Sequence, residues 1–360
     1  MKKMSWDDLI NLSEKSIIEE LTEHDEIILF GAGDGGEKAF KFFQEKNIKV
    51  LFFIDNDYSK IGKQKCGLPI KHLSQVRDKT KKIVISSNWY REISKQLVSE
   101  GFHNYVVFPF SLYYFDNFKA VNLLRDISLL NKMKLIYNLL NDTESKDIWI
   151  RMLLHRYTGD EKYIRKSNYN QYFYPLVNKD KIKNIIDGGA YNGDTIRLFL
   201  EQFPYFEKIH AFEPSSKTFK ELEQINLGEN IREKVILYNK GLWSKSTYLK
   251  FDIDSPSATT NKIDDTGSIT IEVTSIDKII QQENIDYIKL DIEGAELEAL
   301  KGAKNTIIKN RPVLAICIYH LTEHFWEIIE YLYNLDLNYN FYIGHHSSTM
   351  LETVLYAIPK

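Results

Sequence analysis

The chain has 360 residues, of which 43% are hydrophobic and 27% charged, and its formal net charge at pH 7 is −3. This composition predicts a globular protein large enough for two domains, and the small negative charge argues against a nucleic-acid-binding surface, which needs a basic field. No run approaches 18 apolar residues and the N-terminus lacks the apolar core of a signal peptide, so we expect neither a membrane span nor a leader. The two cysteines, Cys66 and Cys317, lie far apart, which indicates a reduced, cytoplasmic setting.

Residues 1–110 alternate helical and strand patterns, and we interpret them as a Rossmann-like nucleotide- or nucleotide-sugar-binding domain. The predicted helices are Ser5–Leu21, Glu37–Lys46 and Tyr90–Glu100, and the predicted strands are Glu26–Phe30, Val50–Ile54, Lys82–Ser86 and Tyr105–Phe108. The residues from Asn56 to Pro69 are expected to form turns.

A glycine loop, Gly31-Ala-Gly33-Asp-Gly-Gly36, joins the first strand of this domain to a helix, and Asp55 follows Gly36 by 19 positions. This G-x-G-x-x-G spacing with a distal acid predicts a second nucleotide site made of Gly31, Gly33, Gly36 and Asp55. A domain that kept its shape and lost its ligand fits the pattern equally well. Ile54-Asp55-Asn56-Asp57 and Gly67-x-Pro69-Ile resemble small sugar-nucleotide-binding domains attached to bacterial glycan-modifying enzymes.

Residues 111–180 carry leucines and isoleucines at helical spacing, with a polar break at Asn141–Ser145 and a further helix at Lys146–His155. We interpret this segment as a helical connector, because it is too apolar for a flexible linker. An aromatic cluster at its end (Tyr169, Tyr172, Phe173 and Tyr174) is expected to serve packing.

A second glycine loop follows a short apolar run ending at Ile186: Asp187-Gly-Gly189-Ala-Tyr-Asn-Gly193, with a helix predicted from Thr195. Glycines allow sharp turns and close approach to a ligand, and the helix N-terminus offers N–H groups to it. The next strand, Lys208–Phe212, ends in Glu213, where a carboxylate can accept hydrogen bonds from both ribose hydroxyls. The loop is looser than a dinucleotide fingerprint and is typical of S-adenosylmethionine enzymes, although a glycine-rich turn occurs in any α/β protein.

The remaining chain continues the α/β alternation, with predicted strands at Val235–Asn239, Ile285–Leu290, Val313–Ile318, Asn340–Ile343 and Glu352–Ala357 and a helix at Phe325–Asn334. Tyr248–Phe251 and Ser268–Val273 are expected to pair antiparallel around Asp252–Thr266, which is either a lid or disordered. Because ligands bind at the carboxyl ends of strands in open α/β sheets, Asp187, Glu213, Asp291, Glu293 and His320 are expected to converge.

Five motifs of the C-terminal half, in order, resemble the FkbM-type methyltransferase family: residues 186–195, Phe212-Glu-Pro214, Lys289-Leu-Asp-Ile-Glu-Gly-Ala-Glu296, residues 312–320 and Glu352–Ala357. The resemblance implies an α/β fold of two Rossmann-like doubly wound domains joined by the connector, with a class I methyltransferase fold at residues 181–360. It also implies transfer of a methyl group from S-adenosylmethionine to a hydroxyl, often on a sugar or polyketide. The loop departs from the family at Gly188, where an aliphatic residue is commoner.

The resemblance also implies roles for single residues. Those expected around the amino-acid end of the cofactor are Asp187, Gly189, Tyr191, Asn192, Gly193 and Asp194. Glu213 would hold the ribose, Gly241 and Leu242 would flank the adenine, and Asp291 would lie near the methionine end or the acceptor. His320 is the candidate base because imidazole titrates near neutrality, with Asp291 as the competing base and Glu293 orienting either one.

A metal site is the further option for this cluster. Asp291 and Glu293 with His324, His345 and His346 offer ligands, but their spacing fits no metal motif, so we expect no metal.

Three functions therefore compete. The first is an S-adenosylmethionine-dependent O-methyltransferase acting on a hydroxyl of a sugar, glycan or sugar nucleotide, with the N-terminal domain holding part of the substrate. The second is a non-catalytic nucleotide-sugar-binding or scaffold protein in glycan assembly. The third is an NAD-dependent sugar oxidoreductase or epimerase built on Gly31–Asp55, which lacks an evident Tyr-x-x-x-Lys pair. The sequence leaves the acceptor and a homo-oligomer open.

Overall fold

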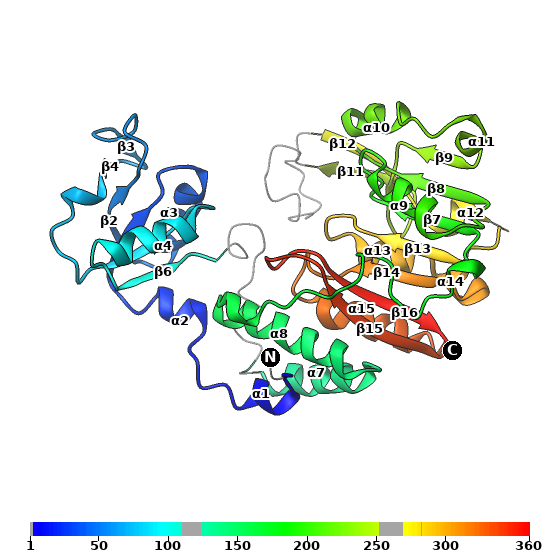
Figure 1. Cartoon of the computed structure of the whole chain (residues 1–360), viewed down its shortest axis with the longest axis horizontal. Coiled ribbons are helices and arrows are strands. Elements are labelled where there is room, and N and C mark those ends of the chain that lie inside the picture. The colour runs from blue at the N-terminus through cyan, green and yellow to red at the C-terminus, as the bar shows by residue number, and fades with distance from the viewer. Residues whose placement is uncertain (1–2, 110–123, 125, 252–268, 282) are drawn as a thin grey trace. The chain divides into compact units, whose positions relative to one another are not determined.

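The computed structural model describes residues 3–109, 124, 126–251, 269–281 and 283–360. The chain divides into two compact units (Figure 1). The N-terminal unit comprises Leu12–Val121 and Arg156–Asp160, and the C-terminal unit comprises Met1–Asn11, Asn122–His155 and Glu161–Lys360. The lid suggested for Asp252–Thr266 and the connector residues 110–123 lie outside the described residues.

The N-terminal unit is built on a six-stranded sheet in the order β3-β4-β2-β1-β5-β6. Its strands are β1 (Glu26–Phe30), β2 (Lys49–Ile54), β3 (Gln64–Lys65), β4 (Leu68–Lys71), β5 (Lys82–Ile85) and β6 (Tyr105–Val107), and its longer helices are α3 (Asp34–Glu45) and α4 (Tyr90–Ser99). All neighbouring strands are parallel except the β3–β4 hairpin, where turns alone were expected. Gly62 and Gly67 have positive φ values of +80° and +77° there, which glycine adopts at little cost.

The single helix expected over Ser5–Leu21 is wrong, because two short helices form instead: α1 (Trp6–Ile10) and α2 (Ile17–Leu21). Each has its own N-terminal cap. Ser16 Oγ accepts a hydrogen bond from the Glu19 backbone N–H at 3.2 Å, and the Ser16 backbone N–H donates to the Glu19 carboxylate at 2.9 Å. This capping box starts a new helix and so ends the continuous apolar face that the sequence pattern suggested.

The C-terminal unit is built on a seven-stranded sheet in the order β15-β16-β14-β13-β7-β8-β9. These strands are β7 (Asn184–Gly188), β8 (Lys208–Phe212), β9 (Val235–Tyr238), β13 (Tyr287–Leu290), β14 (Val313–Cys317), β15 (Tyr339–His345) and β16 (Thr353–Pro359). The central strands are parallel and almost fully buried, as their continuous apolar runs predict, and β16 runs antiparallel between β14 and β15.

A smaller sheet, β10-β12-β11, joins β10 (Gly241–Leu242), β12 (Ile269–Thr274) and β11 (Thr247–Phe251). The predicted antiparallel pairing of its last two strands is confirmed. The remaining α-helices of the unit are α9 (Asp194–Gln202), α10 (Ser216–Glu223), α11 (Glu229–Arg232), α12 (Ile276–Ile280), α13 (Glu296–Lys301), α14 (Lys304–Asn310) and α15 (His324–Asn334).

Two helices from the expected connector, α7 (Ile127–Leu139) and α8 (Thr143–Thr158), lie beside α15 and β15 (Figure 1). The Trp149 indole N–H donates to the Phe325 carbonyl at 3.0 Å, and the Ile343 N–H donates to Ser145 Oγ at 2.9 Å. These buried contacts tie both the α15 helix and the β15 strand to α8. Residues up to His155 therefore belong to the same compact unit as the large sheet.

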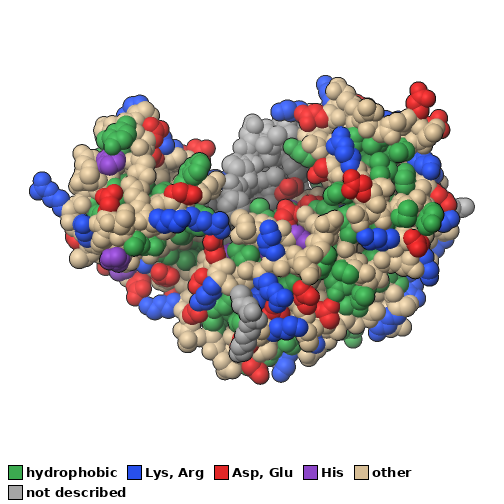
Figure 2. Space-filling model, viewed as in Figure 1, with side chains coloured by type: hydrophobic (Ala, Val, Ile, Leu, Met, Phe, Trp, Pro, Cys, Tyr) green, Lys and Arg blue, Asp and Glu red, His purple; other side chains and the backbone are tan. Residues whose placement is uncertain are grey.

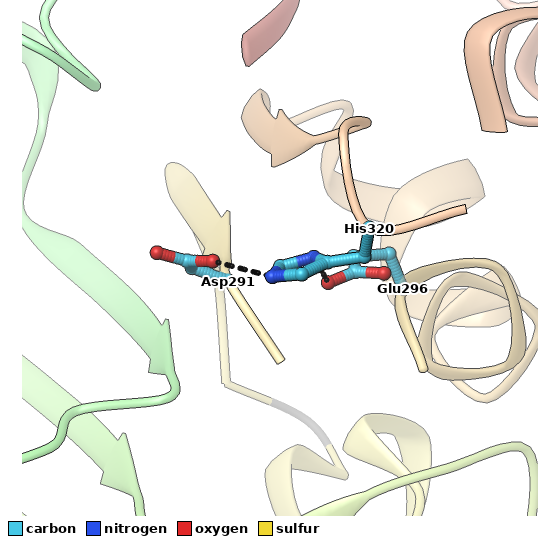
Figure 3. A group of neighbouring side chains, drawn as sticks. All are labelled: Asp291, Glu296 and His320. Atoms are coloured by element: carbon cyan, nitrogen blue, oxygen red, sulfur yellow. Dashed lines mark ion pairs between the residues drawn. The ribbon is translucent and has the colours of Figure 1, made fainter. Parts of the chain in front are cut away.

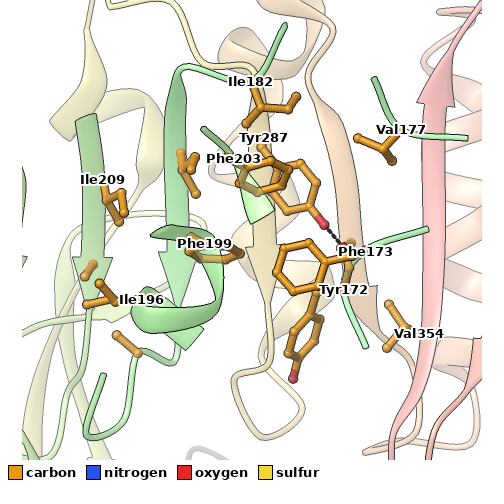
Figure 4. Packing of buried hydrophobic residues seen from close by; sticks show 14 of the residues in the cluster. Tyr172, Phe173, Val177, Ile182, Ile196, Phe199, Phe203, Ile209, Tyr287 and Val354 are labelled. Carbon is orange, nitrogen blue, oxygen red and sulfur yellow. Dashed lines mark hydrogen bonds between the residues drawn. The ribbon is translucent and has the colours of Figure 1, made fainter. Parts of the chain in front are cut away.

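An aromatic cluster forms much of the core of the C-terminal unit (Figure 4). Tyr287 on β13 packs against Phe199 of α9 and against Phe203, which follows the end of that helix, with ring centroids 6.0 Å and 5.1 Å apart. Its hydroxyl donates to the backbone carbonyl of Tyr172. The expected packing role of the aromatic segment before β7 is thus confirmed for Phe173, and the same contacts hold Tyr172 close to the strand ends.

Within the described parts of the chain, no helix combines the length and apolar character that crossing a bilayer requires. On the face shown in Figure 2, basic and acidic side chains are interspersed over the C-terminal unit, in keeping with the small net charge.

Candidate active site

The carboxyl edge of the large sheet gathers residues from five neighbouring strands. Along the order β8, β7, β13, β14 and β16, the residues at this edge are Glu213, Gly189, Asp291, Tyr319 and Glu352. Glu352 joins them because β16 is antiparallel and starts where its neighbours end. All five line one cavity of about 810 Å³, a volume typical of small-molecule sites.

The glycine loop after β7 is shaped by close packing. Gly189 has a φ of +78°, and a Cβ there would lie 2.0 Å from the carbonyl oxygen of Asp291. Gly193, the N-cap of α9, has a φ of +85°, and its Cβ would lie 2.3 Å from Ile225 Cδ1. Both positions therefore require glycine, and the loop lies directly against the end of β13.

Glu213 closes the loop from the end of β8. One carboxylate oxygen accepts a hydrogen bond from the Tyr191 N–H at 3.1 Å, and the other accepts from the Ser215 N–H at 2.8 Å. Burial raises the pKa of Glu213, because the charged form loses solvent. Each carboxylate oxygen still has acceptor capacity toward the cavity, which suits a pair of neighbouring hydroxyls.

One wall of the cavity is apolar. Its lining side chains are Leu198, Phe212, Leu242, Trp243, Leu249, Ile271 and Val273. They come from α9, β8 and the small sheet, next to Glu213. A flat apolar ring joined to a sugar fits this arrangement, with the ring on the apolar wall and the sugar at the carboxylate.

Asp187 lies beneath the loop, fully buried, and does not line the cavity. Its carboxylate is 3.1 Å from Lys289 Nζ, which donates to the carbonyls of Gly188 at 3.1 Å and Gly189 at 2.7 Å. Burial raises the pKa of Asp187, and the Lys289 charge opposes this shift. The pair fixes the carbonyl groups of the glycine loop from below, so Asp187 supports the loop.

Asp291 is held by two tyrosines. Tyr172 donates to Oδ2 at 2.7 Å and Tyr319 donates to Oδ1 at 3.1 Å. Gln171 donates to the Tyr172 hydroxyl at 2.9 Å and also to the Glu352 carboxylate. This network presents carboxylates, an amide and phenols at one end of the cavity.

His320 lies behind that network, 1% exposed, and does not line the cavity. Its Nδ1 is 2.8 Å from Glu296 Oε1, and its Nε2 is 3.5 Å from Asp291 Oδ1 (Figure 3). The same Nε2 is 3.4 Å from Glu293 Oε2. Burial alone would lower the pKa of His320, but the neighbouring carboxylates, Glu296 foremost, outweigh it and raise the pKa to about 9. The neighbouring carboxylates therefore favour the protonated form of the ring, which lies enclosed behind Asp291.

Eight predicted site residues line the cavity: Gly189, Tyr191, Asp194, Glu213, Gly241, Leu242, Asp291 and Glu293. Four others do not: Asp187, Asn192, Gly193 and His320. The histidines considered as metal ligands are engaged elsewhere: His324 faces Glu296 at 3.3 Å, His345 contacts Thr353 at 2.9 Å and His346 contacts Tyr356 at 2.9 Å.

Sequence reasoning missed Tyr172, Tyr319, Gln171 and Glu352. Tyr172 was assigned to packing with its aromatic neighbours. Tyr319 and Glu352 stand inside motifs that carry the family resemblance, and that shared position was the available signal.

The loop of the N-terminal unit is held in a similar way. Asp55 Oδ2 accepts a hydrogen bond from the Ala32 N–H at 2.8 Å and lies 3.0 Å from Lys60 Nζ. A Cβ on Gly36 would lie 2.0 Å from the Gly31 carbonyl oxygen, so packing requires that glycine. Gly33 differs, because a Cβ there meets nothing within 4 Å and its φ of −95° suits any residue.

Comparison with known proteins defines the class. Residues 187–341 match the Methyltransferase FkbM domain, and residues 23–108 match the family described as C2185-like, N-terminal. The crystal structure of methyltransferase FkbM from Methylobacillus flagellatus KT covers 94% of this chain and 92% of its own, with a TM-score of 0.75 and 21% sequence identity, which establishes a shared fold. Residues 187–341 are therefore an FkbM methyltransferase domain, and the expected α/β class with a class I methyltransferase fold and the expected FkbM resemblance are confirmed. The resemblance of the N-terminal unit to sugar-nucleotide-binding domains stays a prediction.

A curated relative is similar over a shorter stretch. The hexuronic acid methyltransferase AglP of Haloferax volcanii is 35% identical over 104 residues, which are 28% of this chain and 42% of AglP. The chain thus matches less than half the length of that relative.

Proposed function

We propose that the C-terminal unit binds S-adenosylmethionine in the cavity and transfers its methyl group to a hydroxyl of a sugar, glycan or sugar nucleotide. The observation that carries the proposal is the shared cavity of Gly189, Glu213 and Asp291 at three neighbouring strand ends of an FkbM domain. Adjacent strands lie about 4.8 Å apart, so Glu213 and Asp291, two strands apart, are separated by roughly 10 Å along the sheet edge. That span suits a ligand whose ribose sits at one carboxylate and whose reactive end sits at the other.

The residues present fit such a ligand. The apolar wall takes the adenine, with Leu242 and Gly241 beside it, and Glu213 accepts the ribose hydroxyls. Gly189, Tyr191 and Asp194 line the same cavity and would lie around the amino-acid end. S-adenosylmethionine supplies an electrophilic methyl group on a sulfonium.

The chain's own residues then position the acceptor and remove its proton. The acceptor oxygen would form a bond to the methyl carbon as the carbon–sulfur bond breaks, and the hydroxyl proton would pass to a carboxylate at this end of the cavity: Asp291, Glu293 or Glu352. Tyr172 and Tyr319 hold Asp291 in place, so much of the acceleration comes from alignment of the two reactants. We assign His320 a positioning role instead of the proton-accepting role, because it is buried behind Asp291.

The sugar class of the acceptor is supported by AglP, whose name gives a hexuronic acid as its substrate. We further propose that the loop of Gly31, Gly33 and Gly36 with Asp55 holds the nucleotide part of a nucleotide or nucleotide-sugar. Gly33 favours this reading, since the fold itself does not require glycine there whereas a closely approaching ligand does.

Calorimetry with S-adenosylmethionine, NAD and a UDP-sugar separates the three functions. Binding of S-adenosylmethionine that Glu213→Ala abolishes supports methyl transfer. Binding of NAD alone indicates an oxidoreductase, and binding of the UDP-sugar alone indicates a scaffold protein. Mass spectrometry of surface glycans with and without the gene would then name the acceptor by the loss of about 14 Da, the mass that a methyl group adds to one sugar.

A further inference from the structure

In the cluster of Asp291, Glu293, Glu296 and His320, one imidazole faces three carboxylates. Asp291, Glu296 and His320 each offer one ligand atom, and these atoms lie within 4.8 Å of one another (Figure 3). His320 and Glu296 are 1% and 0% exposed. In the part of the chain that the structure describes, neither His320 ring nitrogen makes a hydrogen bond of suitable direction. A buried imidazole with an unaligned ring nitrogen facing carboxylates is the typical surrounding of a metal ligand.

The two ring nitrogens of His320 have different neighbours. Nε2 faces the cavity side, 3.5 Å from Asp291 Oδ1 and 3.4 Å from Glu293 Oε2. Two ligand atoms about 2.1 Å from one ion at a tetrahedral angle lie roughly 3.4 Å apart. Each of the two separations from Nε2 therefore matches that of a pair of ligand atoms on one cation.

Glu296 faces the other nitrogen, Nδ1, at 2.8 Å. A carboxylate this close favours the tautomer with its proton on Nδ1, which leaves the Nε2 lone pair for a metal ion. Glu296 is fixed in turn by its contacts with the N–H groups of Ile292 at 3.0 Å and Gly294 at 3.3 Å, and with His324.

The charges of the cluster favour a cation. The carboxylates of Asp291, Glu293 and Glu296 surround a single imidazole, and Glu352 lines the same cavity. Carboxylates gathered this closely repel one another unless a positive charge lies among them, which a proton on His320 supplies only in part.

We propose that a divalent cation of the Mn²⁺ or Zn²⁺ class binds between His320 Nε2, Asp291 and Glu293 at the acceptor end of the cavity. Mixed imidazole and carboxylate ligands suit these ions. Asp291 and Glu293 line the cavity, so the remaining coordination positions face it. The expected absence of a metal rested on His324, His345 and His346. The ligand set proposed here uses His320 instead, and its ligands come from two strand ends that no sequence spacing links.

The role of the cation rests on the proposed function. It binds the acceptor oxygen and lowers the pKa of the hydroxyl, as metal ions do for bound water. With Asp291 and Glu293 as ligands, the carboxylate that remains to receive the hydroxyl proton is Glu352, while the methyl group moves from sulfur to oxygen as before.

The test is a titration of the full-length, EDTA-dialysed protein with Mn²⁺, followed by the loss of the free Mn²⁺ signal in electron paramagnetic resonance. We expect one saturable site, weakened about tenfold or more in Asp291→Asn, Glu293→Gln and Glu296→Gln. Glu293 is half exposed, so its variant should fold even where substitution at the buried His320 does not. Glu298→Gln is the matched control, because Glu298 lies on the same helix as Glu296 but pairs with Lys301. This variant should bind Mn²⁺ as the parent does.

Absence of saturable Mn²⁺ binding overturns the proposal, as does binding that Asp291→Asn and Glu293→Gln leave unchanged. Calorimetry with S-adenosylhomocysteine on the same protein separates the two proposals. If this ligand binds and Mn²⁺ does not, the cation site is wrong and methyl transfer stands. If Mn²⁺ binds and this ligand does not, the cation site stands and methyl transfer is wrong.

Discussion

The chain contains two strand–glycine loop–helix motifs that share one hydrogen-bonding arrangement but differ in its surroundings. In each, an acid at the tip of the following strand accepts a hydrogen bond from the loop: Asp55 from Ala32 at 2.8 Å and Glu213 from Tyr191 at 3.1 Å. Asp55 also pairs with Lys60, whereas Glu213 receives a second backbone N–H from Ser215 and lines a large cavity. Glycine spacing and a distal acid thus predict the shape of the loop. The protein groups that pair with the acid decide whether its carboxylate can still accept hydrogen bonds from a ligand.

Substitution of the loop glycines should give the largest differences between the two units. Gly189→Ala and Gly36→Ala each place a Cβ 2.0 Å from a backbone carbonyl oxygen, so we expect each to lower the free energy of unfolding of its unit by more than about 3 kcal/mol. Gly33→Ala is the control, with an expected change within about 0.5 kcal/mol, because its Cβ meets nothing within 4 Å. Chemical denaturation followed by circular dichroism measures all three. Equal losses for Gly33→Ala and Gly36→Ala would break the distinction between a packed and an open glycine.

Substitutions of the two acids, Glu213 and Asp55, give the next largest expected effect. Glu213→Gln should weaken S-adenosylmethionine binding by about 10- to 100-fold, since hydrogen bonds to a charged group contribute about 1.5–3 kcal/mol. Asp55→Asn should leave that affinity unchanged, because Asp55 belongs to the other unit. Isothermal titration calorimetry gives both values. An unchanged affinity in Glu213→Gln would remove the carboxylate from the proposed ribose site.

The open glycine of the N-terminal loop gives a third, smaller effect. Gly33→Val should keep the stability of the parent yet weaken binding of a UDP-sugar by about tenfold, because the side chain fills the space through which a ligand approaches the backbone. S-adenosylmethionine binding serves as the control and should not change. Equal UDP-sugar affinities in variant and parent would leave the first loop a structural turn.

The pH dependence is the smallest expected effect. Burial raises the pKa of Glu213 above its ordinary value of 4.5, so its carboxylate gains a proton on acidification earlier than an exposed glutamate does. Protonation turns one carboxylate oxygen into an O–H donor and so removes an acceptor position for the ribose hydroxyls. The affinity for S-adenosylmethionine should therefore fall as the pH falls through that raised pKa. Calorimetry across this range should give a slope for the parent and a flatter profile for Glu213→Gln. The same slope in both proteins would assign it to another group.

Much of the fold followed from the sequence because buried parallel strands are continuous apolar runs. The strands containing Ile186 and Phe212, and the acid after each, were found in this way. The broken first helix was not found, since Ser16 and Glu19 form a capping box whose effect outweighs the apolar spacing around it. The β3–β4 hairpin was missed because its two strands are only 2 and 4 residues long.

The candidate site was predicted less completely, for a physical reason. Strand ends place residues at an edge, but the path of the chain after the strand decides whether a side chain faces the cavity. His320 follows the end of β14 by three positions, yet it lies behind Asp291 and does not line the cavity, while its neighbour Tyr319 does. Tyr172 reaches the site because core packing around Tyr287 holds it there, and no sequence spacing encodes that contact.

The central claim is that one cavity holds an adenosine ligand by Glu213 and presents its reactive end to Asp291. A crystal structure of the protein with S-adenosylhomocysteine tests it most directly. The account predicts ribose hydroxyls at hydrogen-bond distance from the Glu213 carboxylate, adenine against Leu242 and sulfur facing the Asp291 end of the cavity. A ligand seated on the Gly31–Gly36 loop, or one in the cavity with its ribose turned away from Glu213, would contradict it.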